Sequence, residues 1–164
     1  ACLTIKTAPN CPWDSPREDI IVEKEEWSRD KLLAEYSRHD CFASASLGEG
    51  LGLPVAEAIM SKLPICTNFW GGHKSLLCEN SFVRMEHEEI PQPYSSDPKF
   101  YADGQKCSFS SPEQVKKSLL SFLALNPQKR ESMSASAKQF FAERYGSPKA
   151  GIRIMERIEK IHGM

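Results

Sequence analysis

Short apolar runs alternate with longer amphipathic stretches along most of this chain. Runs that are short, apolar and bounded by turn residues indicate strands, and they lie at residues 1–7, 20–22, 41–45 and 64–67. Apolar positions at helical spacing predict helices at residues 28–39, 54–62, 112–125, 127–145 and 148–162. Strands that alternate with helices at this spacing are typical of a parallel sheet flanked by helices. We therefore predict an α/β, Rossmann-like fold.

Two other segments are expected to lack regular structure. Three prolines between residues 8 and 19 disfavour helix and strand there, and the chain beyond residues 81–84 is expected to be irregular through residue 111. The last predicted helix carries an apolar stripe of Ile154, Ile158 and Ile161 with Met155 nearby, which we attribute to core packing.

Length and charge narrow the class of protein. The 164 residues fit one domain over residues 1–164, including the C-terminal helices of residues 112–162. A net charge of −1, from 21 basic and 22 acidic residues, argues against broad attraction to nucleic acid or to an anionic membrane. No signal peptide, transmembrane stretch or lipidation motif is visible, so we expect a cytoplasmic protein, with peripheral membrane association of the full-length protein left open. The first residues, 1–5, lack Met and begin a strand at once, as expected of a chain cut from something larger.

The six cysteines fit no zinc pattern. They stand at positions 2, 11, 41, 66, 78 and 107, without a CxxC pair. Cys41 and Cys66 fall in predicted strands, where a free thiol behaves as a small apolar side chain. We expect reduced, structural cysteines in a reducing compartment, and a disulfide framework is the lesser alternative.

One segment, residues 46–58, combines a strand end, a glycine loop and a helix start with two carboxylates. Gly50 and Gly52 allow the backbone to approach a ligand closely. The amides of the helix that opens at Pro54 would face the same space and favour an anion such as a diphosphate. The helix dipole supplies only ~0.3–1 kcal/mol, so cationic groups must come from elsewhere.

The carboxylates of Glu49 and Glu57 would repel a phosphate, so we expect them to bind hydroxyls. Charge-assisted hydrogen bonds of this kind are each worth roughly 1.5–3 kcal/mol. One carboxylate on a ribose and one on a sugar would bracket a diphosphate. This arrangement describes a nucleotide-sugar site.

Glu49 and Glu57, embedded as EGLGLPVAEA, resemble the signature of retaining glycosyltransferases of family 4, the glycosyl transferases group 1. The resemblance extends over about residues 18–164. Its further parts are residues 27–40, residues 41–46, residues 64–67 with Gly71-Gly72-His73, residues 101–106 and the terminal helices.

The resemblance implies the C-terminal, donor-binding half of a two-domain GT-B fold. Glu57 would bind the ribose, and Glu49 would act as the catalytic carboxylate, contacting the transferred sugar and favouring an oxocarbenium-like transition state. Donor binding would further involve Gly50, Leu51 and Gly52 through their amides, Leu53 and Pro54 as walls of the nucleotide pocket, and His73. The implied reaction moves a hexose from a nucleoside-diphosphate sugar to a carbohydrate, lipid-linked or protein acceptor with retention, without a metal and without an enzyme nucleophile.

Two parts of the family pattern cannot be placed in this sequence. They are the Arg and Lys that clamp the phosphates, and the N-terminal acceptor domain. We therefore expect this chain alone to be inactive.

Several alternatives stay open. His73 either contacts the donor or the acceptor, or it is a surface histidine. Lys74 either reaches a phosphate of the donor or is solvated. Trp70 either packs against the protein or forms a stacking platform for a ligand. Residues 86–89, Glu-His-Glu-Glu, have metal-ligand residue types, but a solvated face explains them better. A non-catalytic nucleotide- or partner-binding module is the main rival to an enzyme, and a nucleotide-sugar epimerase is a third reading.

Overall fold

The computed structural model describes residues 1–92 and 104–162, which form two compact units, Ala1–Arg38 and His39–Met164. In the first unit β1 (Leu3–Lys6) and β2 (Ile20–Glu23) pair in parallel, with Leu3 opposite Ile20. The helix α1 (Arg29–Arg38) follows. The prediction that residues 1–164 form one domain stays a prediction.

Local sequence explains where α1 begins. The Ser28 hydroxyl accepts a hydrogen bond from the Lys31 amide at 3.2 Å, which satisfies an amide that the first helical turn leaves unbonded. The strands and the helix of this unit therefore lie where the apolar runs and the Ser28 cap predict them.

The second unit is built on a parallel sheet of β3 (Phe42–Ser44), β4 (Ile65–Asn68) and β5 (Val83–Met85), in that order. Ala43 lies opposite Cys66, which in turn lies opposite Val83. The central strand β4 is buried along its whole length, as expected for a parallel strand covered on both faces. The predicted α/β class is confirmed.

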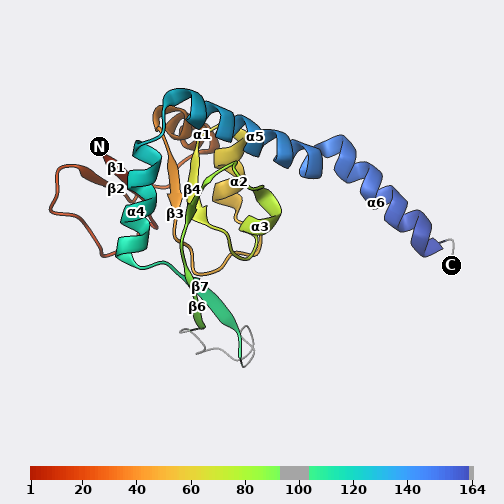
Figure 1. Cartoon of the computed structure of the whole chain (residues 1–164), viewed down its shortest axis with the longest axis horizontal. Helices are drawn as coiled ribbons and strands as arrows, with labels where there is room; N and C mark the ends of the chain where they lie inside the picture. Colours follow the sequence, from red (N-terminus) through yellow and green to blue (C-terminus); the bar gives the residue numbers. More distant parts are fainter. Residues whose placement is uncertain (93–103, 163–164) are drawn as a thin grey trace. The chain divides into compact units, whose positions relative to one another are not determined.

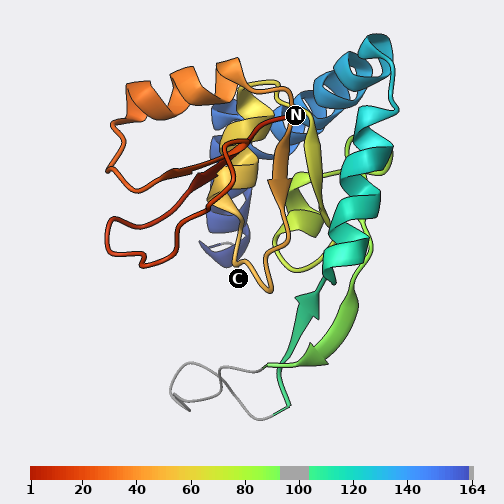
Figure 2. The same ribbon diagram turned by 90° about the vertical axis from the view of Figure 1, so that its left-hand side faces the viewer.

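Helices cover both faces of this sheet. The helix α2 (Leu53–Met60) contacts β3 and β4, whereas α4 (Pro112–Leu123) contacts β4 and β5 from the opposite side (Figures 1 and 2). The long helix α5 (Pro127–Tyr145) packs on α2 and on the short α3 (His73–Leu76). The core between them consists of buried apolar side chains, among them Val55, Ile59, Ile65, Leu76, Leu77, Met85 and Phe122. Each such side chain contributes roughly 1.5–3 kcal/mol through removal from water.

The starts of α4 and α5 are encoded locally. The Ser111 hydroxyl accepts from the Gln114 amide at 3.3 Å, and the Gln114 side chain accepts from the Ser111 amide at 2.7 Å. This reciprocal capping box precedes Pro112. Asn126 caps α5 in the same way, accepting from the Lys129 amide at 2.8 Å.

The apolar stripe of α6 (Ser147–His162) does not pack into a core. Its members Ile154, Met155, Ile158 and Ile161 are all 42–59% exposed, so the core-packing prediction is wrong. Figure 1 shows α6 leading away from the sheet beyond the end of α5. Periodicity establishes that one side of a helix is apolar, but it does not establish what covers that side.

A hairpin replaces part of the segment that was expected to be irregular. The strands β6 (Glu88–Pro91) and β7 (Lys106–Phe109) pair antiparallel, with Ile90 opposite Cys107. The irregular prediction is wrong here because the partner strands are distant in sequence and their polar residues hide the pattern. Residues 101–103, within the stretch that resembles the family, lie outside the described residues.

Candidate functional site

Two loops meet at the carboxyl ends of β3 and β4. Parallel strands end at the same edge of a sheet, and in open α/β sheets ligands bind beyond that edge. The loop after β3 contains Glu49, and its carbonyl oxygen accepts a hydrogen bond from the Gly72 amide in the loop after β4 at 3.0 Å. The loop that carries the predicted carboxylate is therefore hydrogen-bonded to the loop that carries the Gly71-Gly72 pair.

Glycine allows these loops to come so close. A Cβ atom on Gly72 would lie 2.6 Å from the Gly50 carbonyl oxygen and 2.7 Å from Leu51 Cα. Gly71 has φ +51°, and a Cβ there would lie 3.0 Å from the Glu49 carbonyl oxygen. Backbone lies against backbone, so larger residues would push the loops apart.

The start of α2 is left without a side-chain cap. Gly52 occupies the N-cap position with φ +88° and ψ 60°, and its carbonyl accepts the Ala56 amide at 3.0 Å. Pro54 lies in the first turn, where its missing N–H costs no hydrogen bond. The N-terminal amides of the helix therefore carry no capping side chain and are suited to an anion.

Both predicted carboxylates are half-buried. The Ser46 hydroxyl donates to Glu49 Oε1 at 3.1 Å and lies 3.2 Å from the Gly48 carbonyl oxygen. Glu57 lies in the second turn of α2, beside the buried Ala56 and Ala58. That the two carboxylates serve one ligand stays a prediction.

The side chains that were expected to line the nucleotide pocket lie at the surface. Leu53 is 65% exposed and Pro54 is exposed as well, and Leu51, which was expected to act through its amide, is 41% exposed. The apolar surface of Leu53 and Pro54 lies at the uncapped start of α2.

His73 is buried rather than exposed, so its reading as a surface histidine is wrong. It is 1% exposed, and a Cβ atom on Gly52 would lie 2.9 Å from its Cδ2 atom. The ring therefore lies against the backbone of the glycine loop. Direct contact between His73 and a donor stays a prediction.

A buried polar network around His73 was missed from sequence. The Asn68 side-chain amide donates to the Ser46 carbonyl and to Ser108 Oγ, both at 2.7 Å. The Thr67 hydroxyl donates to the Ser44 carbonyl at 2.8 Å. The sequence does contain a signal for this network, since Thr67 and Asn68 are polar residues at the carboxyl end of an otherwise apolar strand. Buried polar groups need hydrogen-bond partners, so two such residues in a buried strand indicate a polar network.

The aromatic and basic residues that follow β4 form a small surface group. Lys74 is exposed, and its ammonium lies 5.1 Å from the centre of the Trp70 ring. His87 meets the half-buried Trp70 ring edge-on at a centroid distance of 5.8 Å. Packing and stacking roles for Trp70 both stay open.

Within residues 1–92 and 104–162, no group of three or more His, Cys, Asp or Glu could hold a metal ion. Glu86, Glu88 and Glu89 are exposed, which confirms the solvated face predicted there. In the same described part of the chain, no helix combines the length and apolar character needed to cross a bilayer.

All six cysteines are free thiols, as expected. Burial raises the pKa of the Cys66 thiol to about 11. The pKa of Cys41 rises to about 12, mainly through burial and secondly through the nearby Cys66. Both thiols are therefore protonated and unreactive at neutral pH.

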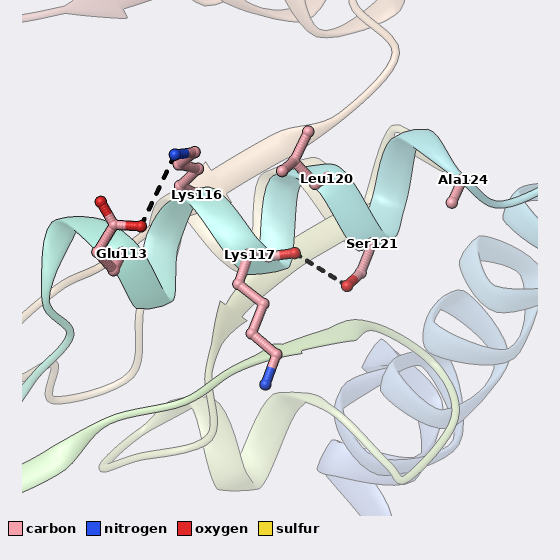
Figure 3. A pocket seen from close by; sticks show the side chains of 6 residues that line it. All are labelled: Glu113, Lys116, Lys117, Leu120, Ser121 and Ala124. Carbon is pink, nitrogen blue, oxygen red and sulfur yellow. Dashed lines mark hydrogen bonds and ion pairs between the residues drawn. The ribbon is translucent and has the colours of Figure 1, made fainter.

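Two hollows of the surface lie apart from the predicted site residues. One, of about 420 Å³, runs along α4 and is lined by Glu113, Lys116, Lys117, Leu120, Ser121 and Ala124 (Figure 3). The other, of about 230 Å³, is lined by Glu79, Asn80, Phe82 and Arg84. The residues that line the first hollow come from α4 and its C-terminal end. The polar interactions among them, such as the hydrogen bond from the Ser121 hydroxyl to the Lys117 carbonyl oxygen, lie within that helix.

Comparison with known proteins supports the fold. No family model matches the chain, and no curated protein sequence matches it. Among solved structures, it is similar to the C-terminal domain of a glycosyl transferase group 1 family protein, LpcC, from Francisella tularensis, with a TM-score of 0.51 and 19% identity. The match covers 78% of this chain and 54% of that one, so this chain spans about half the length of its structural neighbour. The predicted fold, a parallel sheet flanked by helices like the C-terminal half of a GT-B enzyme, is confirmed.

Proposed function

We propose that this chain is the donor-binding part of a retaining glycosyltransferase, which transfers a hexose from a nucleoside-diphosphate sugar to a hydroxyl acceptor. The observation that carries the proposal is the glycine loop between Glu49 and Gly52, held by the loop after β4 beside the uncapped start of α2. The likeness in fold to a glycosyltransferase domain supports the same class of protein.

In this proposal the start of α2 faces the diphosphate. Amides at a helix start donate to phosphate oxygens, and the helix dipole adds about 0.3–1 kcal/mol. This contribution is too small to hold a diphosphate, so the site also needs cations. We expect an Arg and a Lys to provide them, as in the family that the sequence resembles.

The carboxylates act at the two ends of the donor. Glu57 accepts hydrogen bonds from the ribose hydroxyls, and Glu49 contacts the transferred sugar, where its charge favours an oxocarbenium-like transition state. The hydrogen bond from Ser46 restricts the Glu49 carboxylate before substrate arrives. Leu53 and Pro54 provide apolar surface for the nucleoside.

Calorimetric titration of the full-length protein with UDP, GDP, ADP and CDP tests this proposal. We expect one nucleotide to bind at least about tenfold more tightly than the others, since a pocket shaped for one base leaves polar groups unpaired with another. A transfer assay with the corresponding nucleotide-sugars then reports the sugar and the stereochemistry. Failure of every nucleotide to bind the folded protein would remove the proposal.

A further inference from the structure

The His73 imidazole has a defined proton position. Its Nδ1 lies 3.1 Å from the Asn68 carbonyl oxygen, 3.1 Å from Asn68 Oδ1 and 3.3 Å from Thr67 Oγ1. The two Asn68 oxygens only accept, and the Thr67 hydroxyl proton is used on the Ser44 carbonyl. Nδ1 therefore carries the proton and donates, which leaves a lone pair on Nε2 in the neutral ring.

The opposite edge of the same ring supports the start of α2. A Cβ atom on Gly52 would lie 2.9 Å from His73 Cδ2 and 3.1 Å from Nε2. Nε2 is buried, and no hydrogen-bond partner for it is found among residues 1–92 and 104–162. Leaving a ring nitrogen unpaired is unfavourable, so packing alone would be better served by an apolar side chain of this size.

The Nδ1 edge explains why a histidine is useful here. Through Nδ1 the ring fixes Asn68, whose side-chain amide donates to the Ser46 carbonyl at 2.7 Å and to Ser108 Oγ at 2.7 Å. Ser46 begins the glycine loop and Gly52 ends it. One buried side chain is thus linked to the first residue of the loop through Asn68 and touches the last residue directly.

We infer that His73 is a positioning residue, which holds residues 46–52 in the conformation that leaves the first amides of α2 uncapped. The part of this inference that concerns donor binding rests on the proposed function. The part that concerns the loop stands on the geometry alone, and it predicts that the Nδ1 donor matters more than the volume of the ring.

Three substitutions separate these contributions. His73→Asn keeps a side-chain N–H close to the Nδ1 position, whereas His73→Phe keeps a ring but has no donor. His73→Gln places its amide near the Nε2 position instead, and it serves as the comparison if His73→Phe does not fold.

Amide hydrogen exchange in the full chain, without ligand, is the first measurement. We expect exchange of the Gly72 and Ala56 amides, which donate to the Glu49 and Gly52 carbonyl oxygens, to be roughly tenfold faster in His73→Phe and His73→Gln, and close to wild type in His73→Asn. Unchanged exchange in all the variants, or loss of protection in His73→Asn equal to that in His73→Phe, would overturn the inference.

Titration of the same variants with UDP and GDP tests the consequence for binding. We expect the nucleotide that binds wild type to lose roughly tenfold in affinity with His73→Phe and less than about threefold with His73→Asn. Wild-type affinity in His73→Phe would contradict a role of His73 in donor binding. If wild type itself binds neither nucleotide nor any other nucleoside diphosphate, the proposed function fails, while the exchange measurement still decides whether His73 holds the loop.

Discussion

The Gly72 amide donates a hydrogen bond to the Glu49 carbonyl oxygen at 3.0 Å, and this bond joins the loops that follow two neighbouring parallel strands. Gly72 is also the point of closest approach, because a Cβ there would lie 2.6 Å from the Gly50 carbonyl oxygen. The position of the Glu49 backbone is therefore set from β4 as well as from β3. A change at Gly72 should reach the predicted donor loop although Gly72 lies in a different segment.

Replacing Gly72 with alanine should lower the stability of the fold. The added methyl group would collide with backbone atoms that have no easy way to move, and overpacking of this kind typically costs about 1–3 kcal/mol. Gly48→Ala is the matched control, because a Cβ at Gly48 meets nothing within 4 Å. Urea unfolding should show the loss for Gly72→Ala and a change within about 0.5 kcal/mol for Gly48→Ala. Equal stabilities of the two variants would show that the loops do not pack as described.

The stripe on α6 gives a second comparison. Ile154 is 59% exposed, whereas Ile59 on α2 is fully buried. The same change to alanine should therefore cost about 2–5 kcal/mol at Ile59 and within about 0.5 kcal/mol at Ile154. Chemical denaturation of the chain measures both. A large loss for Ile154→Ala would restore the core-packing interpretation of the stripe.

Most of the fold followed from local patterns, and the exceptions share a physical cause. The apolar runs located β3 and β4, and apolar positions at helical spacing located α4, because these signals act over a few residues. The hairpin of β6 and β7 was missed because its pairing joins segments distant in sequence.

Long-range contacts also limited the prediction of the site. The glycine loop, its two carboxylates and its approach to a helix start could be anticipated from residues 46–58. The burial of His73 could not, because it depends on Gly52 and Asn68 being brought together by the fold. The exposure of the apolar stripe on α6 could not be predicted from the sequence for the same reason, since a periodic pattern does not identify the surface that covers it.

Two thiols whose pKa values are raised, those of Cys41 and Cys66, predict how the free energy of unfolding depends on pH. The pKa of Cys66 is raised to about 11 and that of Cys41 to about 12, from the ordinary 9.0, largely by burial. Well below pH 9 both thiols are protonated in the folded and unfolded states. Above it the unfolded chain loses these protons first, so the free energy of unfolding should fall as pH rises through the interval toward the raised pKa values.

Urea titrations at pH 8 and at about pH 10 measure this fall. Other groups also titrate in this range, so the informative quantity is the difference between wild type and a Cys41→Ala, Cys66→Ala double variant. The double variant should lose less stability between the two pH values. An identical loss in both proteins would mean that these thiols do not contribute.

Donor affinity of Glu57→Ala, measured by calorimetry in the full-length protein, tests the central claim most directly. Loss of charge-assisted hydrogen bonds to ribose hydroxyls should cost roughly 1.5–3 kcal/mol, which is a loss of tenfold or more in affinity. Glu131→Ala, at an exposed position on α5, removes the same charge and should leave affinity unchanged. An affinity for the nucleotide-sugar in Glu57→Ala equal to that of wild type and of Glu131→Ala would contradict the account.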